Sequence, residues 1–258
     1  MRSFLFNIAF YGFTALVAIA CLPLTYLHSP KPLAAVLHWW AKGIVWLLRH
    51  VAGIHMEVRG RENIPVEGPS LIASKHQSFS DGILVLSLLP QIATVAMKDL
   101  LDYPAVGRIL TKLDMIMVDT CGGGTERNTL STAAKRAYDN GRHILIYPEG
   151  QLVLVGDRER YKVGVYHLYA DLELPVTPVA TNVGLCWQCR AWRKTPGKVV
   201  LSFLEPIRTG LDKDTFMRVL EDTIEAETAR LVGERAWARR NITRSSGCSS
   251  HRASCRSS

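Results

Sequence analysis

The chain has 258 residues, which is enough for one catalytic-size domain with a short appendage and excludes two large domains. About half of the residues are hydrophobic (48%) and the mean hydropathy is +0.08, which is high for a freely soluble enzyme and low for a polytopic membrane protein and favours a mostly soluble domain with a membrane attachment. The formal net charge is +8, but residues 235–258 hold six arginines and no acid, so the body carries only about +2 and is not the basic body of a nucleic-acid-binding protein.

The first 53 residues are predicted to form a membrane-associated helical segment. Residues 4–27 contain no charged side chain, and at about 1.5 Å per residue they are long enough to cross a hydrocarbon core of about 30 Å. A second apolar run has Trp39, Trp40 and Trp46 around Lys42, which is typical of a helix at headgroup depth. We therefore expect one spanning or re-entrant helix with an interfacial partner. A cleaved signal peptide and a buried hairpin are the alternatives.

Residues 54–234 are predicted to form the main domain, with an α/β fold: a mixed, largely parallel sheet flanked by helices. Short apolar runs alternate there with segments of helical periodicity. Strands are expected at residues 70–74, 92–96, 115–118, 143–147, 176–180 and 199–203. Helices are expected at residues 82–89, 100–113, 128–138 and 214–232. Residues 235–258 are predicted to be a basic tail, with disorder expected from Asn241 onward.

The first candidate for chemistry is the run from Ser74 to Asp81, between a predicted strand and an apolar helix. Reactive groups gather in such loops of α/β sheets. His76 and Asp81 would lie about 140° apart in a regular helix, so a turn is needed to bring them together. With that turn, Asp81 accepts a hydrogen bond from one imidazole nitrogen and leaves the other as a base. The alternative is a satisfied histidine beside a helix-capping aspartate.

Two further runs end or interrupt predicted strands. In Y-P-E-G, Pro148 stops the ladder and Gly150 permits close backbone approach, so Glu149 is held at a sheet edge that a polar ligand can reach; an ordinary strand-ending turn is the alternative. Residues 174–180 have two prolines in a strand-like stretch, which favours an edge strand or a bulge. Ser78 and Ser80 remain candidate nucleophiles, although the chain has no G-x-S-x-G elbow.

The cysteines favour reduced thiols. Their spacing is not that of a disulfide framework. Cys186 and Cys189 form one C-x-x-C, but a structural zinc site needs four ligands and no second pair lies nearby. We therefore expect no metal.

In this order and spacing, the runs resemble the lysophospholipid acyltransferase family typified by 1-acylglycerol-3-phosphate acyltransferase, over about residues 35–232. The run H-Q-S-F-S-D is similar to the family's H-x-x-x-x-D motif, Y-P-E-G to its F-P-E-G motif, and P-V-T-P-V-A to its V-P-x-x-P-V strand. Shorter likenesses surround Lys98 and Lys162. The resemblance implies that residues 54–234 are an acyltransferase catalytic domain.

The resemblance also implies a role for each matching residue. His76 is implied to be the catalytic base and Asp81 the acid that orients it. Glu149, Gly150 and Lys98 are implied to bind the substrate.

Two positions depart from the family pattern. Thr120 stands where the family's second motif ends in arginine, and Gln151 and Leu152 fill the last two places of its E-G-T-R. Both arginines that the family offers to phosphate are therefore absent, and each lost charged hydrogen bond costs about 1.5–3 kcal/mol. Three nearby cations are predicted to bind the substrate instead, with a solvated basic turn as the alternative: Arg158, Arg160 and Lys162.

The resemblance implies transfer of a fatty acyl group from acyl carrier protein (acyl-ACP) or acyl-coenzyme A to the free hydroxyl of a lysophospholipid, above all 1-acylglycerol-3-phosphate giving phosphatidic acid. The implied partners are the lysophospholipid acceptor, the thioester donor and membrane lipids, with the domain on the cytoplasmic face of the inner membrane. No bound cofactor, metal or nucleic acid is expected, and backbone N–H groups at residues 77–79 are the expected donors to the oxyanion. A non-phosphate acceptor such as a lyso-ornithine lipid, or a catalytically silent lipid-binding homologue, is the alternative.

Overall fold

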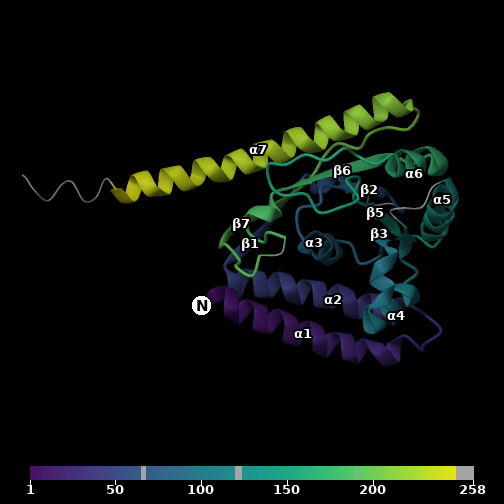
Figure 1. Cartoon of the computed structure of the whole chain (residues 1–258), viewed down its shortest axis with the longest axis horizontal. Coiled ribbons are helices and arrows are strands. Elements are labelled where there is room, and N and C mark those ends of the chain that lie inside the picture. The colour runs from purple at the N-terminus through teal and green to yellow at the C-terminus, as the bar shows by residue number, and fades with distance from the viewer. Residues whose placement is uncertain (65–67, 120–123, 190, 248–258) are drawn as a thin grey trace, which may run out of the picture.

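A computed structural model describes residues 1–64, 68–119, 124–189 and 191–247, and its centre is one seven-stranded sheet (Figure 1). The strand order is β1-β7-β6-β2-β5-β3-β4, and all neighbours run parallel except β6 and β7. The strands are β1 (Ile54–Arg59), β2 (Leu71–Ser74), β3 (Ile92–Met97), β4 (Ile116–Val118), β5 (His143–Ile146), β6 (Val176–Thr181) and β7 (Gly197–Phe203). This is the mixed, largely parallel sheet flanked by helices that the sequence predicts.

Helices cover both faces of this sheet (Figure 1). On one face lie α1 (Arg2–Leu24), α2 (Lys31–Leu47) and α3 (Ser80–Leu88); on the other lie α5 (Gly124–Asp139), α6 (Gly164–Leu172) and α7 (Lys213–Gly247). Successive strand residues serve opposite faces: Ile72 belongs to the core cluster with α1, α2 and α3, whereas Leu71 and Ala73 belong to the cluster with α5, α6 and α7. The remaining α-helix, α4 (Pro104–Lys112), packs against α1. Short helical turns occupy Leu48–Ala52, Arg61–Asn63, Lys98–Asp102 and Val183–Leu185.

All six predicted strands are present, and two elements were not predicted. The strand β1 has the sequence I-H-M-E-V-R and pairs only with β7, so it is an edge strand. Its apolar and polar residues alternate, so it does not appear as a short apolar run like the predicted strands. The helix α6 has nine residues, is apolar over most of its length, and has no side-chain cap, so neither periodicity nor a start signal marks it.

The proline-containing strand β6 is central, not at an edge. It lies between β7 and β2, so the edge interpretation is wrong, and the bulge alternative is correct. Between the Val176–Ile207 pair and the Val179–Phe203 pair the register shifts by one residue. The carbonyl of Pro178 accepts a 2.9 Å hydrogen bond from this bulged segment, so the N–H that proline lacks also faces the bulge.

The helix α7 is longer than predicted. Its apolar stripe, which includes Phe216, Leu220 and Ile224, is buried against the sheet as expected. The helix then continues past the body to Gly247 (Figure 1), so the disorder expected from Asn241 is wrong for residues 241–247. Residues 248–258 lie outside the described part of the chain.

The apolar helix α1 lies along the body. Among the described residues it is the one helix long and apolar enough to cross a membrane. At its start, Asn7 Nδ2 donates to the carbonyl of Trp192 at 3.0 Å; just beyond its end, the Arg108 guanidinium of α4 lies 4.5 Å from the Tyr26 ring centroid. A 23-residue helix is about 35 Å long. Both ends of α1 are thus attached to the same body.

Candidate active site

The loop between β2 and α3 brings His76 and Asp81 together. The Nδ1 atom of His76 lies 3.0 Å from Asp81 Oδ2, so the turn that the five-residue spacing requires is present. The same oxygen accepts the backbone N–H of Gln77 at 2.7 Å and that of Ser78 at 2.8 Å. Asp81 therefore fixes the backbone of the loop before α3 with the carboxylate that also holds the imidazole.

These contacts determine which nitrogen of His76 is available. Backbone N–H groups only donate, so Asp81 Oδ2 acts as an acceptor and the proton between it and His76 belongs to Nδ1. Burial raises the pKa of the fully buried Asp81 carboxyl, and the hydrogen bonds from His76, Ser78 and Gln77 oppose that rise. The His76 side chain is 21% exposed. Its Nε2 atom is left as a base that a ligand can reach.

The strand β5 supplies the second support of the imidazole. The ring of Tyr147 stacks on His76, with centroids 3.9 Å apart and planes 19° from parallel. The Tyr147 hydroxyl is buried and has no hydrogen-bond partner within the described ranges. Burial raises its pKa well above the usual value, and the charge of Asp81 adds to the rise. The imidazole is thus restrained on one edge by a carboxylate and on one face by a phenol ring.

Behind the loop lies a buried ion cluster that sequence reasoning missed. The Lys75 ammonium lies 2.5 Å from Glu149 Oε1 and 2.6 Å from Glu225 Oε1 of α7. The second oxygen of Glu149 accepts the backbone N–H of His76 at 2.8 Å, and Tyr161 donates its hydroxyl to Glu225 at 3.0 Å. Burial lowers the pKa of Lys75, but the two carboxylates outweigh it and leave that pKa raised. Both oxygens of Glu149 are thus used inside the protein, away from solvent.

A ligand-facing base, held by a buried carboxylate at the end of a parallel strand, can take a proton from a hydroxyl. The two serines of the loop are not available as nucleophiles in the same way. Ser78 and Ser80 are buried, and their hydroxyl oxygens are 2.9 Å apart in a mutual hydrogen bond. Of the N–H groups of residues 77–79 expected as oxyanion donors, those of Gln77 and Ser78 are already bonded to Asp81, so the expectation does not fit this geometry for these two residues.

Comparison with known proteins agrees with this geometry. The model of the family described as Acyltransferase matches residues 55–182, which include all of β1 except Ile54, the His76–Asp81 loop and the whole of β6. Residues 55–182 therefore resemble an acyltransferase domain. The resemblance inferred from the short motifs is thereby confirmed.

Two curated relatives extend this likeness beyond the family model. The chain is 35% identical to the 1-acyl-sn-glycerol-3-phosphate acyltransferase of Pseudomonas aeruginosa over 164 residues, 64% of this chain and 63% of that one. It is 26% identical to the human 1-acyl-sn-glycerol-3-phosphate acyltransferase alpha over 170 residues, 65% and 60% of the two chains. The chain thus spans a little under two thirds of the length of these curated relatives.

The crystal structure of the 1-acyl-sn-glycerophosphate (LPA) acyltransferase PlsC from Thermotoga maritima has the same fold. The two share a TM-score of 0.71 over 89% of this chain and 97% of that one, at 20% identity. At this identity the likeness supports the fold alone, which is the mixed, largely parallel sheet flanked by helices.

The remaining predicted site residues lie around two turns. Gly150 has φ +65°, and a side chain there would meet the stem of Lys162, so the turn and this lysine pack closely. Arg158 is exposed and has its Nε 4.0 Å from Glu225 Oε2, while Arg160 is exposed on the same loop.

Lys98 is exposed and begins the helical turn after β3. Leu152 is half-buried beside the Y-P-E-G turn, and Thr120 lies outside the described residues. In the described part of the chain, no group of three or more His, Cys, Asp or Glu side chains is placed to hold a metal ion.

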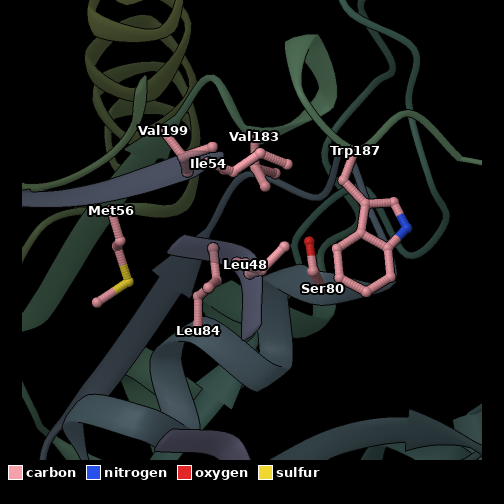
Figure 2. A pocket seen from close by; sticks show the side chains of 8 residues that line it. All are labelled: Leu48, Ile54, Met56, Ser80, Leu84, Val183, Trp187 and Val199. Carbon is pink, nitrogen blue, oxygen red and sulfur yellow. The ribbon is translucent and has the colours of Figure 1, made fainter. Parts of the chain in front are cut away.

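A small cavity lies beside the start of α3 (Figure 2). Its lining is apolar apart from Ser80, the neighbour of Asp81, and consists of Leu48, Ile54, Met56, Ser80, Leu84, Val183, Trp187 and Val199. Its volume of about 10 Å³ is close to the minimum for one water molecule, far below that of an acyl chain. The apolar surroundings on this side of the loop keep the first turn of α3 out of water.

Proposed function

We propose that this protein transfers a fatty acyl group from a thioester to the free hydroxyl of a lysophospholipid. The observation that carries the proposal is the 3.0 Å contact between His76 Nδ1 and Asp81 Oδ2, which leaves Nε2 as the base. The match to the acyltransferase family model and the relatives named as 1-acyl-sn-glycerol-3-phosphate acyltransferases support it.

The reaction follows from that geometry. The acceptor hydroxyl gives its proton to His76 Nε2 while its oxygen attacks the thioester carbonyl carbon, and Asp81 stabilises the imidazolium that forms. The carbon–sulfur bond then breaks, and the leaving thiolate takes the proton from the imidazolium. The products are an ester and a free thiol, either that of the acyl carrier protein or that of coenzyme A. No metal or bound cofactor takes part in these steps.

The acceptor that we propose is 1-acylglycerol-3-phosphate, giving phosphatidic acid in phospholipid biosynthesis. The names of the relatives favour this acceptor. The absence of arginine at residues 120 and 152 favours the second candidate, a lysolipid without a phosphate monoester such as a lyso-ornithine lipid. Lys98, Arg158, Arg160 and Lys162 are the proposed contacts of the acceptor headgroup.

The membrane is the proposed location, with the domain on the cytoplasmic face of the inner membrane. The outward face of α1 exposes large apolar side chains, among them Phe4, Leu5, Ile8 and Tyr11, and α2 exposes Trp39 and Trp46. Because both ends of α1 contact the same body, we propose that the helix lies in the membrane interface instead of crossing the bilayer. A lysolipid and its product both reside there.

The test is acyl transfer by the detergent-purified full chain to lysophosphatidic acid and to lyso-ornithine lipid, with acyl carrier protein and coenzyme A thioesters as donors. His76→Ala is expected to lower the rate by about 10²–10⁴-fold. His55→Ala changes an exposed histidine of β1 and serves as the matched control, with an unchanged rate. Transfer that persists in His76→Ala, or a wild-type protein that acylates neither lysolipid, contradicts the proposal; the second result favours a silent lipid-binding homologue.

A further inference from the structure

Lys75 is a buried cation that the proposed reaction does not use. Its side chain is only 1% exposed, although lysine is among the residues least often buried. Taking an ammonium out of water is unfavourable unless it is paired, and Lys75 has two carboxylate partners. Such a group is expected to have a specific task.

The partners of Lys75 come from two different parts of the fold. Glu149 follows β5, and Glu225 lies on α7. Because Glu149 also accepts the N–H of His76, a continuous chain of contacts leads from α7 through Glu225, Lys75 and Glu149 to the backbone of the catalytic base. The hydroxyl of Tyr161 donates to the same Glu225 oxygen and fixes it further.

This chain of contacts ends at the part of the loop backbone that positions Asp81. The N–H groups of residues 76, 77 and 78 are consecutive, and each donates to a carboxylate: the first to Glu149 and the next two to Asp81. A shift of the first N–H therefore moves the two that position Asp81 against the imidazole. The docking of α7 does not depend on this contact, because Phe216, Leu220 and Ile224 bury its apolar stripe.

We propose that Lys75 and Glu225 are positioning residues, which act through Glu149 to hold the catalytic loop against helix α7. The proposal rests on the proposed function for its effect on rate. Its effect on the loop itself is independent of any activity. Misplacing the reacting groups lowers kcat. The KM for the acceptor should stay unchanged, because other residues bind the acceptor.

The experiment compares Glu225→Ala with Asp222→Asn in the full chain. Asp222 is an exposed residue of the same helix, and both changes remove one negative charge from α7. Glu225→Ala is expected to lower kcat by about tenfold with KM for the lysolipid unchanged, and Asp222→Asn to change neither. Glu225→Gln, which keeps an oxygen for Lys75 and Tyr161, is expected to restore most of the lost kcat.

Amide hydrogen exchange gives the readout that needs no activity. In Glu225→Ala, peptides that cover residues 74–81 are expected to exchange faster than in Asp222→Asn, while peptides of α7 stay protected. Unchanged exchange in the loop overturns the proposal. A lower melting temperature with unchanged kcat also overturns it, because the cluster is then structural alone. A wild-type protein without acyl transfer whose loop still loosens in Glu225→Ala contradicts the proposed function and leaves the positioning role supported.

Discussion

Lys75 and His76 are consecutive residues whose side chains lie on opposite faces of the sheet. Lys75 still pairs like a strand residue, since its N–H donates to the carbonyl of Val179 at 2.9 Å. Successive side chains of a strand point to opposite faces, so Lys75 faces α7 and meets Glu225, whereas His76 faces α3 and meets Asp81. One residue is 1% exposed and the other 21%.

The difference shows how a strand end separates support from chemistry. On the α7 face, every charge is paired inside the protein, so the cluster determines the shape of the loop but offers nothing to a ligand. On the α3 face, Asp81 holds Nδ1 of His76 and leaves Nε2 unused. Changes on the α3 face should therefore cause the largest losses of activity. Changes on the α7 face should cause the largest losses of stability, together with the smaller loss of kcat expected for Glu225→Ala.

The largest effect on activity is expected for Asp81→Asn. The amide keeps the volume and an oxygen for the backbone N–H groups and for His76 Nδ1, but it carries no charge to stabilise the imidazolium. We expect kcat to fall by about 10²–10⁴-fold. Because burial raises the pKa of Asp81, the fold already disfavours the charge, and the melting temperature should change little.

Measurement of kcat and of the melting temperature in the same detergent tests this expectation, with the exposed Asp222→Asn as control. A variant that keeps its rate within about tenfold would show that Asp81 fixes the loop backbone and does no more.

The largest effect on stability is expected for Lys75→Met. The change leaves the carboxylates of Glu149 and Glu225 buried without their shared cation, which costs about 3–5 kcal/mol. The control is Lys198→Met, which removes the exposed partner of Glu57 and should cost no more than about 1 kcal/mol. Thermal or chemical unfolding of the three proteins measures the difference; equal losses in the two variants would refute the comparison.

The stability of Lys75→Met at alkaline pH provides a second test of the same ion cluster. The folded-state pKa of Lys75 is raised above 10.5 by its two carboxylates, which outweigh burial. Its contribution is therefore fully present below pH 10.5 and is lost as the pH rises through the folded-state value. The gap in unfolding free energy between wild type and Lys75→Met should narrow only above pH 10.5, and a gap that narrows near neutrality would point to a different group.

Much of the fold can be predicted from the sequence because the central strands are buried on both faces. The strands β2 and β5 therefore appear as short, mostly apolar runs with clear ends. The edge strand β1 does not appear as a continuous apolar run, because every second residue in it is polar: His55, Glu57 and Arg59. The position of β6 in the sheet was predicted wrongly. A proline shows only that one backbone N–H is missing, and it does not show that the strand lacks a neighbour.

The candidate site is predictable only in part, because some of the residues that contact one another there lie far apart in the sequence. His76 and Asp81 are five residues apart, so one short run shows both. Lys75 stands in that same run, but its partner Glu225 is 150 residues away, and nothing local distinguishes it from an exposed lysine. The same limit applies to Glu149, which a turn motif locates but whose two oxygens are committed by Lys75 and His76.

The smallest effect is expected for Tyr147→Phe, which tests whether the α3 face depends on the ring or on the hydroxyl. The ring stacks on His76, and phenylalanine keeps that contact, so kcat should stay within about threefold of wild type. The hydroxyl is buried without a partner within the described ranges, so its removal should leave the unfolding free energy unchanged or raise it by about 1 kcal/mol.

Tyr161→Phe is the matched control, because that hydroxyl donates to Glu225 and its loss should cost about 1.5–3 kcal/mol. The Oδ1 atom of Asp81 is also buried without a partner within the described ranges. A drop in kcat of a hundredfold or more in Tyr147→Phe would therefore mean that this hydroxyl bonds to Asp81 during turnover, and that the carboxylate is held from two sides in place of one.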